Sequence, residues 1–272
     1  MPNTYIPHVQ VRNNAILIYE RPAVEPPKKM NLEGFKSAYS GKMSTGSQKR
    51  IRKAIDIMLQ TNPERKIWNP VVEVFHPFRL GFVTLTVSED SKNLTAKEGY
   101  TVLLKEWLRW ASRKGVSDYI WKAELQERGQ IHWHVTVNQF IHYLDIQKSW
   151  NRLQKRAGLL EGYARKFGHF NPNSTDVHAV KNIRDFEAYL AKYLAKNDQN
   201  QSSTTGKLWD CSASLKRARF SDVMDGETND NLREAIRKGF QQVQMEHCTL
   251  IKTKEPQKLL SPALATAYEN WK

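Results

Sequence analysis

The chain is poor in cysteine and has no long apolar run. Its 272 residues include two cysteines, Cys211 and Cys248, which are too few and too far apart for a disulfide framework or a zinc knuckle. No stretch of about 18 consecutive apolar residues occurs, and no signal-peptide pattern is seen, so neither a membrane span nor secretion is expected. We therefore expect a cytoplasmic protein without a membrane partner.

The sequence also lacks a phosphate-binding loop and an internal repeat. Gly41-Lys42 and Gly206-Lys207 both lack the upstream glycine spacing and the following Ser/Thr of the P-loop motif. The chain therefore carries no motif for an ATP-driven helicase of its own.

Acidic residues are in the minority. The chain has 42 Lys and Arg against 28 Asp and Glu, which gives a formal net charge of +14. Such an excess indicates an anionic partner, with nucleic acid as the default, because Lys and Arg that neutralise phosphates release counterions. Eight Trp, ten Tyr and ten Phe add surfaces on which unpaired bases can stack. The simpler alternative is a solvated basic surface.

Half of this charge lies near the beginning of the chain. Residues 1–70 hold twelve Lys or Arg against five Asp or Glu, a net +7. This region is our candidate for contacts with duplex or origin DNA, although a basic helix is as often only a soluble surface.

The segment Ile131–Val137 alternates apolar and polar residues, which is typical of a half-buried β-strand. Successive side chains on a strand point to opposite faces, so Trp133 and the two valines are expected in the core. His132, His134 and Thr136 then share the other face. Two imidazoles on one face of a rigid strand form half of a divalent-metal site.

A second β-prone run, Tyr119–Leu125, precedes this strand, and Glu127–Gln130 indicates a turn. In the resulting hairpin we expect Glu124 roughly opposite Trp133 or His134, within reach of a shared ligand. A carboxylate and two imidazoles would give three metal ligands and leave positions open for substrate oxygens. The alternative is two half-buried histidines and an unrelated surface glutamate.

Three segments of the chain follow one another in a characteristic order: Gly81–Val87 with its Thr-hydrophobe-Thr ending, His132-Trp133-His134, and Tyr189–Lys196 with two tyrosines. This set resembles the motifs of the HUH endonucleases, the superfamily of rolling-circle replication initiators (Rep proteins), relaxases and related transposases. The phrase from Glu124 to His134 resembles the initiators of small single-stranded DNA phages and rolling-circle plasmids. The resemblance covers about residues 81–200.

The order of the expected elements, β-α-β-β-α-β-α, suggests an α+β fold, and the resemblance specifies it further. The fold class is α+β, a ferredoxin-like HUH fold whose five-stranded antiparallel sheet is packed with helices and carries both histidines on a central strand. We expect a basic, partly helical N-terminal extension (1–70), the nuclease domain (71–215) and a helical C-terminal extension (216–272).

Periodicity places most of the elements independently of the resemblance. Helices are expected from Ser44 or Ser47 to before Asn62, through Leu103–Ala111, and from Asp145 to Ala157. Weaker patterns predict short strands within 11–19 and 177–180, an extended arm over 21–29, an edge strand at 206–209 and a helix over 221–244.

A further helix is predicted over residues 183–197. At about 100° per residue, Tyr189 and Tyr193 fall at the edge of its apolar stripe, and Lys192 and Lys196 lie alongside. A phenol with a pKa of about 10 must lose its proton as it attacks, and neighbouring ammonium groups could stabilise that charge. Single-tyrosine and two-tyrosine mechanisms both fit, with Tyr189 slightly favoured if one acts alone. The alternative is that both rings cover the edge of the core.

Together these features predict an initiator that nicks single-stranded origin DNA through a 5′-phosphotyrosine link and rejoins it. Glu124, His132 and His134 would bind Mg²⁺ or Mn²⁺, with His142, His169 and His178 as candidate outer ligands. The enzyme would depend on a host helicase and DNA polymerase, in the cytoplasm of a bacterial host. A relaxase or two-tyrosine transposase, a non-catalytic single-stranded DNA-binding module and a structural zinc protein are the alternatives.

Overall fold

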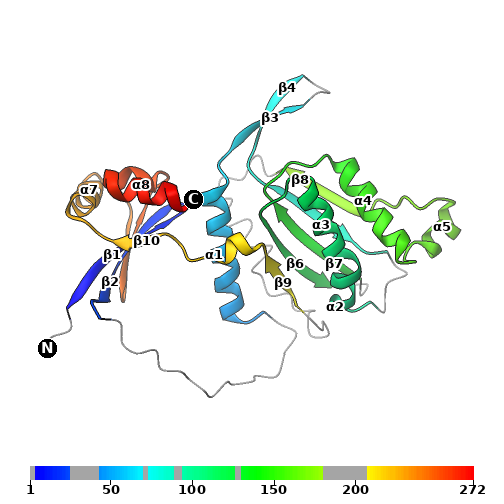
Figure 1. The fold of residues 1–272 in the computed structure, drawn as a ribbon, viewed down its shortest axis with the longest axis horizontal. Helices are drawn as coiled ribbons and strands as arrows, with labels where there is room; N and C mark the ends of the chain where they lie inside the picture. The colour runs from blue at the N-terminus through cyan, green and yellow to red at the C-terminus, as the bar shows by residue number, and fades with distance from the viewer. Residues whose placement is uncertain (1–3, 25–42, 70–72, 89–93, 126–129, 180–206) are drawn as a thin grey trace, which may run out of the picture. The chain divides into compact units, whose positions relative to one another are not determined.

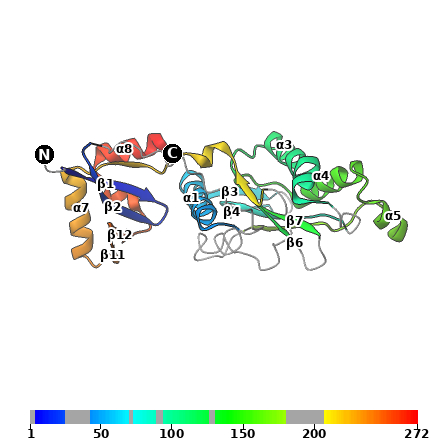
Figure 2. The ribbon, with the colours of Figure 1, turned by 90° about the horizontal axis from the view of Figure 1, so that it is seen from below.

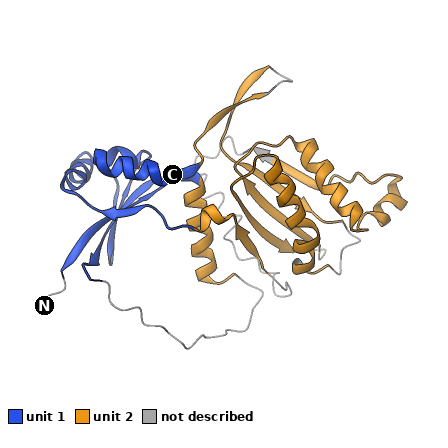
Figure 3. Cartoon of the chain, viewed as in Figure 1, with its two compact units in different colours: residues 1–37, 59–61, 217–272 blue, residues 38–58, 62–216 orange. Residues whose placement is uncertain are grey.

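The computed structural model describes residues 4–24, 43–69, 73–88, 94–125, 130–179 and 207–272 (Figure 1). The chain divides into two compact units, shown in Figure 3. Unit 1 comprises residues 1–37, 59–61 and 217–272, and unit 2 comprises residues 38–58 and 62–216. Each unit contains its own five-stranded sheet.

The sheet of unit 2 has the strand order β8-β5-β7-β6-β9, and every neighbouring pair is antiparallel. Its strands are β5 (Gly81–Thr86), β6 (Tyr119–Leu125), β7 (Ile131–Val137), β8 (Thr175–Ala179) and β9 (Trp209–Cys211). The expected mixed α+β fold with a five-stranded antiparallel sheet is confirmed, and β7, which carries both histidines, is the central strand. The predicted edge strand near residue 209 is β9.

Helices cover one face of this sheet, as Figure 2 shows for α3 and α4. The first is continuous from α2 (Ala96–Gly99) through a π-helical turn (Tyr100–Leu104) into α3 (Lys105–Arg113). The second is α4 (Tyr143–Arg156), which is followed by α5 (Glu161–Phe167). Helix α4 begins two residues earlier than expected, because the side chain of His142 caps it by accepting a hydrogen bond from the amide of Leu144.

Indole rings dominate the core between these helices and the sheet. Trp107, Trp133 and Trp150 are fully buried, and the rings of Trp133 and Trp150 meet edge to face with their centroids 5.9 Å apart. A Cβ atom at Gly99 would lie 2.7 Å from the ring of Trp133. The close approach of helix and strand therefore requires glycine at position 99. The predicted inward face of β7 is confirmed.

Helix α1 (Thr45–Thr61) has the predicted ends. Ser44 caps it by accepting a hydrogen bond from the amide of Ser47, and Asn62 ends it. The Asn62 side chain donates to Asp118 at 3.0 Å, and Asn138 donates to Asn62 at 3.0 Å. This buried amide–carboxylate network joins the end of α1 to the residues that flank β6 and β7. A separate hairpin, β3 (Arg65–Asn69) and β4 (Val74–Phe78), follows α1.

The sheet of unit 1 combines residues from distant parts of the chain, in the order β10-β1-β2-β12-β11. Its strands are β1 (Tyr5–Arg12), β2 (Ala15–Pro22), β10 (Ser221–Val223), β11 (Gln242–Met245) and β12 (Cys248–Lys252). Helices α7 (Gly226–Arg237) and α8 (Pro262–Trp271) and the 3₁₀ turn Pro256–Leu259 complete the unit. The apolar residues of its core include Val9, Val11 and Ile16.

Two weaker expectations from the sequence were wrong in detail. Instead of one short strand within 11–19, residues 5–22 form a hairpin of two strands, and the second strand extends to Pro22, into the expected arm. The expected helix over 221–244 is α7 alone, with strands on both sides. Among the described helices, none combines the length and apolar content that a membrane span requires.

Candidate metal centre

The face of the unit 2 sheet opposite to α3 and α4 carries Glu124, His132 and His134. Glu124 on β6 is paired with His132 on β7, which corrects the expected partner, Trp133 or His134. One carboxylate oxygen, Oε2 of Glu124, lies 3.3 Å from Nε2 of His132 and 3.1 Å from Nε2 of His134. The structure thus brings together the three residues that the sequence analysis assigned to a metal.

Two neighbours on β5 fix the ring of His134. Phe82 stacks on it with centroids 5.3 Å apart, and the hydroxyl oxygen of Thr84 lies 3.2 Å from its Nδ1. With a metal bound, Nδ1–H would donate a hydrogen bond to the Thr84 hydroxyl, and the Nε2 lone pair would be directed at the ion. The contact of Thr84 with a candidate ligand was not predicted from the sequence.

Lys122 is the second residue that sequence reasoning missed. Its side chain is 0% exposed, and its Nζ atom lies 2.5 Å from Oε1 of Glu124. The signal was its position, two residues before Glu124 on an alternating strand, which places both on one face. A buried lysine needs a partner, because desolvation of an unpaired ammonium group is very costly.

The electrostatics of the cluster favour an ionised Glu124. Burial opposes its ionisation, but hydrogen bonds from His132 and His134 and the charge and hydrogen bond of Lys122 outweigh that effect and hold the pKa of Glu124 well below its usual range. The carboxylate therefore remains an anionic ligand at neutral pH, with Oε1 held by Lys122 and Oε2 directed at the imidazoles.

The arrangement fits a divalent ion. Two ligand atoms about 2.2 Å from an ion and at right angles to each other lie about 3 Å apart, close to the separations of Glu124 from the two histidines. The carboxylate of Glu124 and the two imidazoles each offer one ligand atom, and these three atoms lie within 4.8 Å of one another. Within the described residues this is the one cluster of three or more such side chains. Imidazole and carboxylate groups are common ligands of divalent metal ions in proteins.

Of the candidate outer ligands, two lie away from the cluster. His142 caps α4, and His169 accepts a hydrogen bond from the amide of Asn171 at 3.2 Å, so neither belongs to the cluster. His178 is on β8, and its side chain is outside the described part. The predicted catalytic segment, with Tyr189, Lys192, Tyr193 and Lys196, lies outside the residues that the structure describes.

The fold and site thus define an α+β protein with a three-ligand candidate metal centre on a central strand. Residues 81–198, less than half of the chain, match the family model Replication-associated protein ORF2/G2P. The match fits a rolling-circle replication initiator, supports a role in DNA replication and suggests endonuclease activity in general terms. It begins at β5 and includes all three candidate ligands. No curated protein and no solved structure gave a match.

Proposed function

We propose that the protein is an HUH-type replication initiator that cuts single-stranded DNA at an origin and rejoins it, and so starts and ends rolling-circle replication. The observation that carries the proposal is the cluster of Glu124, His132 and His134 on the central and neighbouring strands. It lies inside the segment that matches the replication-associated family.

The described residues have distinct roles in this proposal. Glu124, His132 and His134 hold Mg²⁺ or Mn²⁺, which would neutralise charge on the scissile phosphate when bound. When the ion is bound, the Thr84 hydroxyl would accept a hydrogen bond from Nδ1–H of His134, which leaves the Nε2 lone pair for the ion. Lys122 keeps Glu124 ionised and fixes the orientation of its carboxylate.

The nucleophile is a tyrosine from the segment outside the described residues. The oxygen of Tyr189 or Tyr193 forms a bond to phosphorus, and the bond from phosphorus to the 3′ oxygen breaks, which leaves a 5′-phosphotyrosine and a free 3′-OH. Lys192 and Lys196 stabilise the phenolate and the charge on the phosphate. The phosphodiester energy is retained in the link, so rejoining is the reverse reaction and needs no ATP.

The products define the partners of the reaction. A free 3′-OH is the primer that a host DNA polymerase extends. Because the chain has no P-loop motif, strand separation falls to a host helicase. If the helix predicted over 183–197 forms, Tyr189 and Tyr193 are one turn apart, and one could hold the 5′ end while the other cuts the regenerated origin.

The test is covalent capture of DNA. Labelled single-stranded oligonucleotides from the origin of the encoding replicon are incubated with the protein in Mn²⁺, Mg²⁺ or EDTA and separated on a denaturing gel. The expected result is a metal-dependent protein–DNA adduct that the Tyr189→Phe/Tyr193→Phe double variant does not form. Each single variant then shows whether one tyrosine or both are used, and Glu124→Ala should also abolish the adduct.

A metal-independent adduct would exclude the assigned role of the three ligands. No adduct on a verified origin with either metal would contradict the nuclease and leave a single-stranded DNA-binding module. An adduct that persists in the double variant would place the nucleophile elsewhere.

A further inference from the structure

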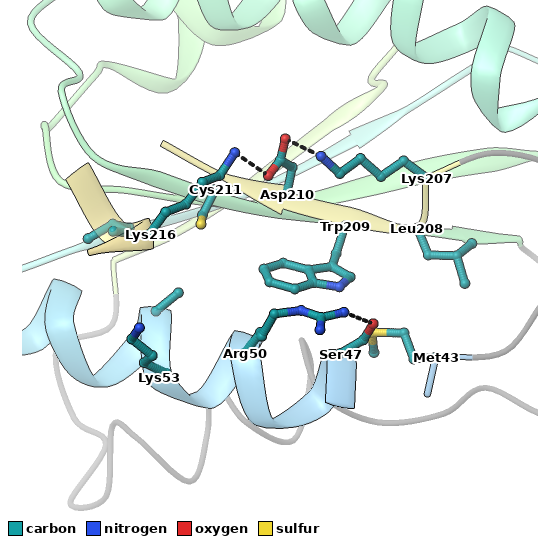
Figure 4. A pocket seen from close by; sticks show the side chains of 12 residues that line it. Met43, Ser47, Arg50, Lys53, Lys207, Leu208, Trp209, Asp210, Cys211 and Lys216 are labelled. Atoms are coloured by element: carbon teal, nitrogen blue, oxygen red, sulfur yellow. Dashed lines mark hydrogen bonds and ion pairs between the residues drawn. The ribbon is translucent and has the colours of Figure 1, made fainter. Parts of the chain in front are cut away.

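Unit 2 contains a pocket of about 530 Å³ between α1 and β9 (Figure 4). Trp209 from the strand and Arg50 from the helix extend toward the same space, and Lys53 lies one helical turn beyond Arg50. Pockets of about 300–1,000 Å³ are the size that binds small organic ligands. The pocket is therefore large enough for part of a nucleotide chain.

The pocket opens on the face of the sheet that carries the metal centre. Trp209 is paired with Lys122, and Lys122 is paired with His134, so the three side chains share one face of three adjacent strands. Two interstrand spacings of about 4.8 Å put the backbone of Trp209 about 10 Å from that of His134. A strand that has its phosphate at the metal centre thus passes close to the pocket.

The charges of the lining residues favour an anion. Four cationic side chains and one carboxylate line the pocket, a net charge of +3. The carboxylate, Asp210, points away from Trp209 (Figure 4) and is paired with Lys207 at 2.6 Å and Lys216 at 3.0 Å. The ammonium groups of Lys207 and Lys216 lie beside Asp210 on that side of the strand, so Arg50 and Lys53 are the cations that face a phosphate in the pocket.

The apolar part of the lining completes a site for a base. Met43, Leu208 and Leu215 are buried lining residues, and Trp209, which is only partly buried, offers an indole ring. An aromatic ring beside cationic side chains is the combination that binds unpaired bases and their phosphates, because every base has a π-face.

The geometry points to a nucleotide-binding subsite for the single-stranded substrate, in which a base stacks on Trp209 while Arg50 and Lys53 contact the adjoining phosphates. The subsite holds the strand beside the metal centre and would make cutting depend on a nucleotide near the cleaved bond. The inference rests on the proposed function for the identity of the substrate, but the binding itself requires no cleavage.

Binding is measured with full-length protein in EDTA, by anisotropy of a labelled thymidine oligonucleotide and of an abasic oligonucleotide of equal length. Trp209→Ala should weaken binding of the thymidine strand about five-fold or more and leave the abasic strand nearly unaffected. Trp209→Phe keeps a ring and should restore most of the loss. Thermal melts establish that each variant is folded.

The phosphate contacts are tested by salt dependence. Arg50→Gln/Lys53→Gln removes two charges and should weaken binding of both the thymidine and the abasic oligonucleotide. The magnitude of the slope of log K against log salt should fall by about 1.4 for single-stranded DNA. The matched control is Lys105→Gln/Arg109→Gln, which removes the same charges from exposed positions on α3, on the opposite face. The control should change the slope less.

Two outcomes would overturn the subsite. One is a Trp209→Ala variant that binds thymidine DNA as the parent does, and the other is equal losses for the thymidine and abasic strands. The adduct assay separates this failure from failure of the proposed function. If the parent protein forms the adduct but Trp209→Ala binds DNA as the parent does, the subsite is refuted and the nuclease is retained. If binding depends on the base but no adduct forms, the nuclease is refuted and the subsite is retained.

Discussion

Replacement of Lys122 by methionine tests how the candidate metal centre is held together. The lysine is 0% exposed and its ion pair with Glu124 is 2.5 Å long, whereas the carboxylate side chain is 18% exposed. Methionine has a similar volume and preserves the packing. The variant therefore removes a charge while it leaves the buried space filled.

The expected cost follows from this burial. Loss of one partner of a buried ion pair costs about 3–5 kcal/mol, and Glu124 retains some solvent contact and two imidazole hydrogen bonds, which favours the lower end. A loss of about 3 kcal/mol lowers the Tm of a unit of this size by about 6–12 °C. Lys122→Met/Glu124→Gln removes both charges and should recover at least half of the loss.

The assay is thermal unfolding in EDTA, followed by far-UV circular dichroism. Lys207→Met is the matched control, since this lysine also pairs with a carboxylate, at 2.6 Å, but is 59% exposed; an exposed pair contributes about 0–1 kcal/mol. A Tm of Lys122→Met equal to that of Lys207→Met would refute the buried ion pair as a source of stability. So would a Lys122→Met/Glu124→Gln variant that is no more stable than Lys122→Met.

Three further predictions concern other parts of the chain. Thr84→Val should weaken Mn²⁺ binding, measured by calorimetry, about 10-fold or more; unchanged affinity would exclude the tautomer role. Burial, and then the charge of Asp210, raises the pKa of the Cys211 thiol to about 11. At pH 8 iodoacetamide should therefore label Cys248 first, as peptide mass mapping would show, and equal rates would contradict this. Gly99→Ala should cost about 1–3 kcal/mol in denaturant unfolding through its clash with the buried indole; parent-like stability would count against that packing.

Alternation along the chain predicted the two strands of the hairpin, but it could not predict their register. A four-residue turn at 127–130 would pair Gln126 with Ile131 and put Glu124 opposite Trp133. In the structure Leu125 pairs with Ile131, so one more residue lies in the connection. Since paired residues share a face, this single residue places Glu124 beside the histidines instead of in the core.

The contacts that support the ligands were harder to predict, because they come from separate strands. Thr84 reaches His134 only because β5 pairs with β7, and periodicity contains no information about which strands are neighbours. Alternation places Lys122 on the same face as Glu124, but only the fold, in which β9 pairs with β6, shows that its side chain is buried. The sheet of unit 1 was missed for the same reason.

The sheet of unit 1 also has a consequence for synthesis on the ribosome. Strands β1 and β2 emerge first, but their partners β10 and β12 lie about 200 residues later. At about 5–20 residues per second the first hairpin waits about 10–40 s for those partners. During that interval the apolar side chains of Val9, Val11 and Ile16 lack their final neighbours. The nascent hairpin therefore exposes these side chains during synthesis, and a chain released before residue 221 cannot complete this sheet.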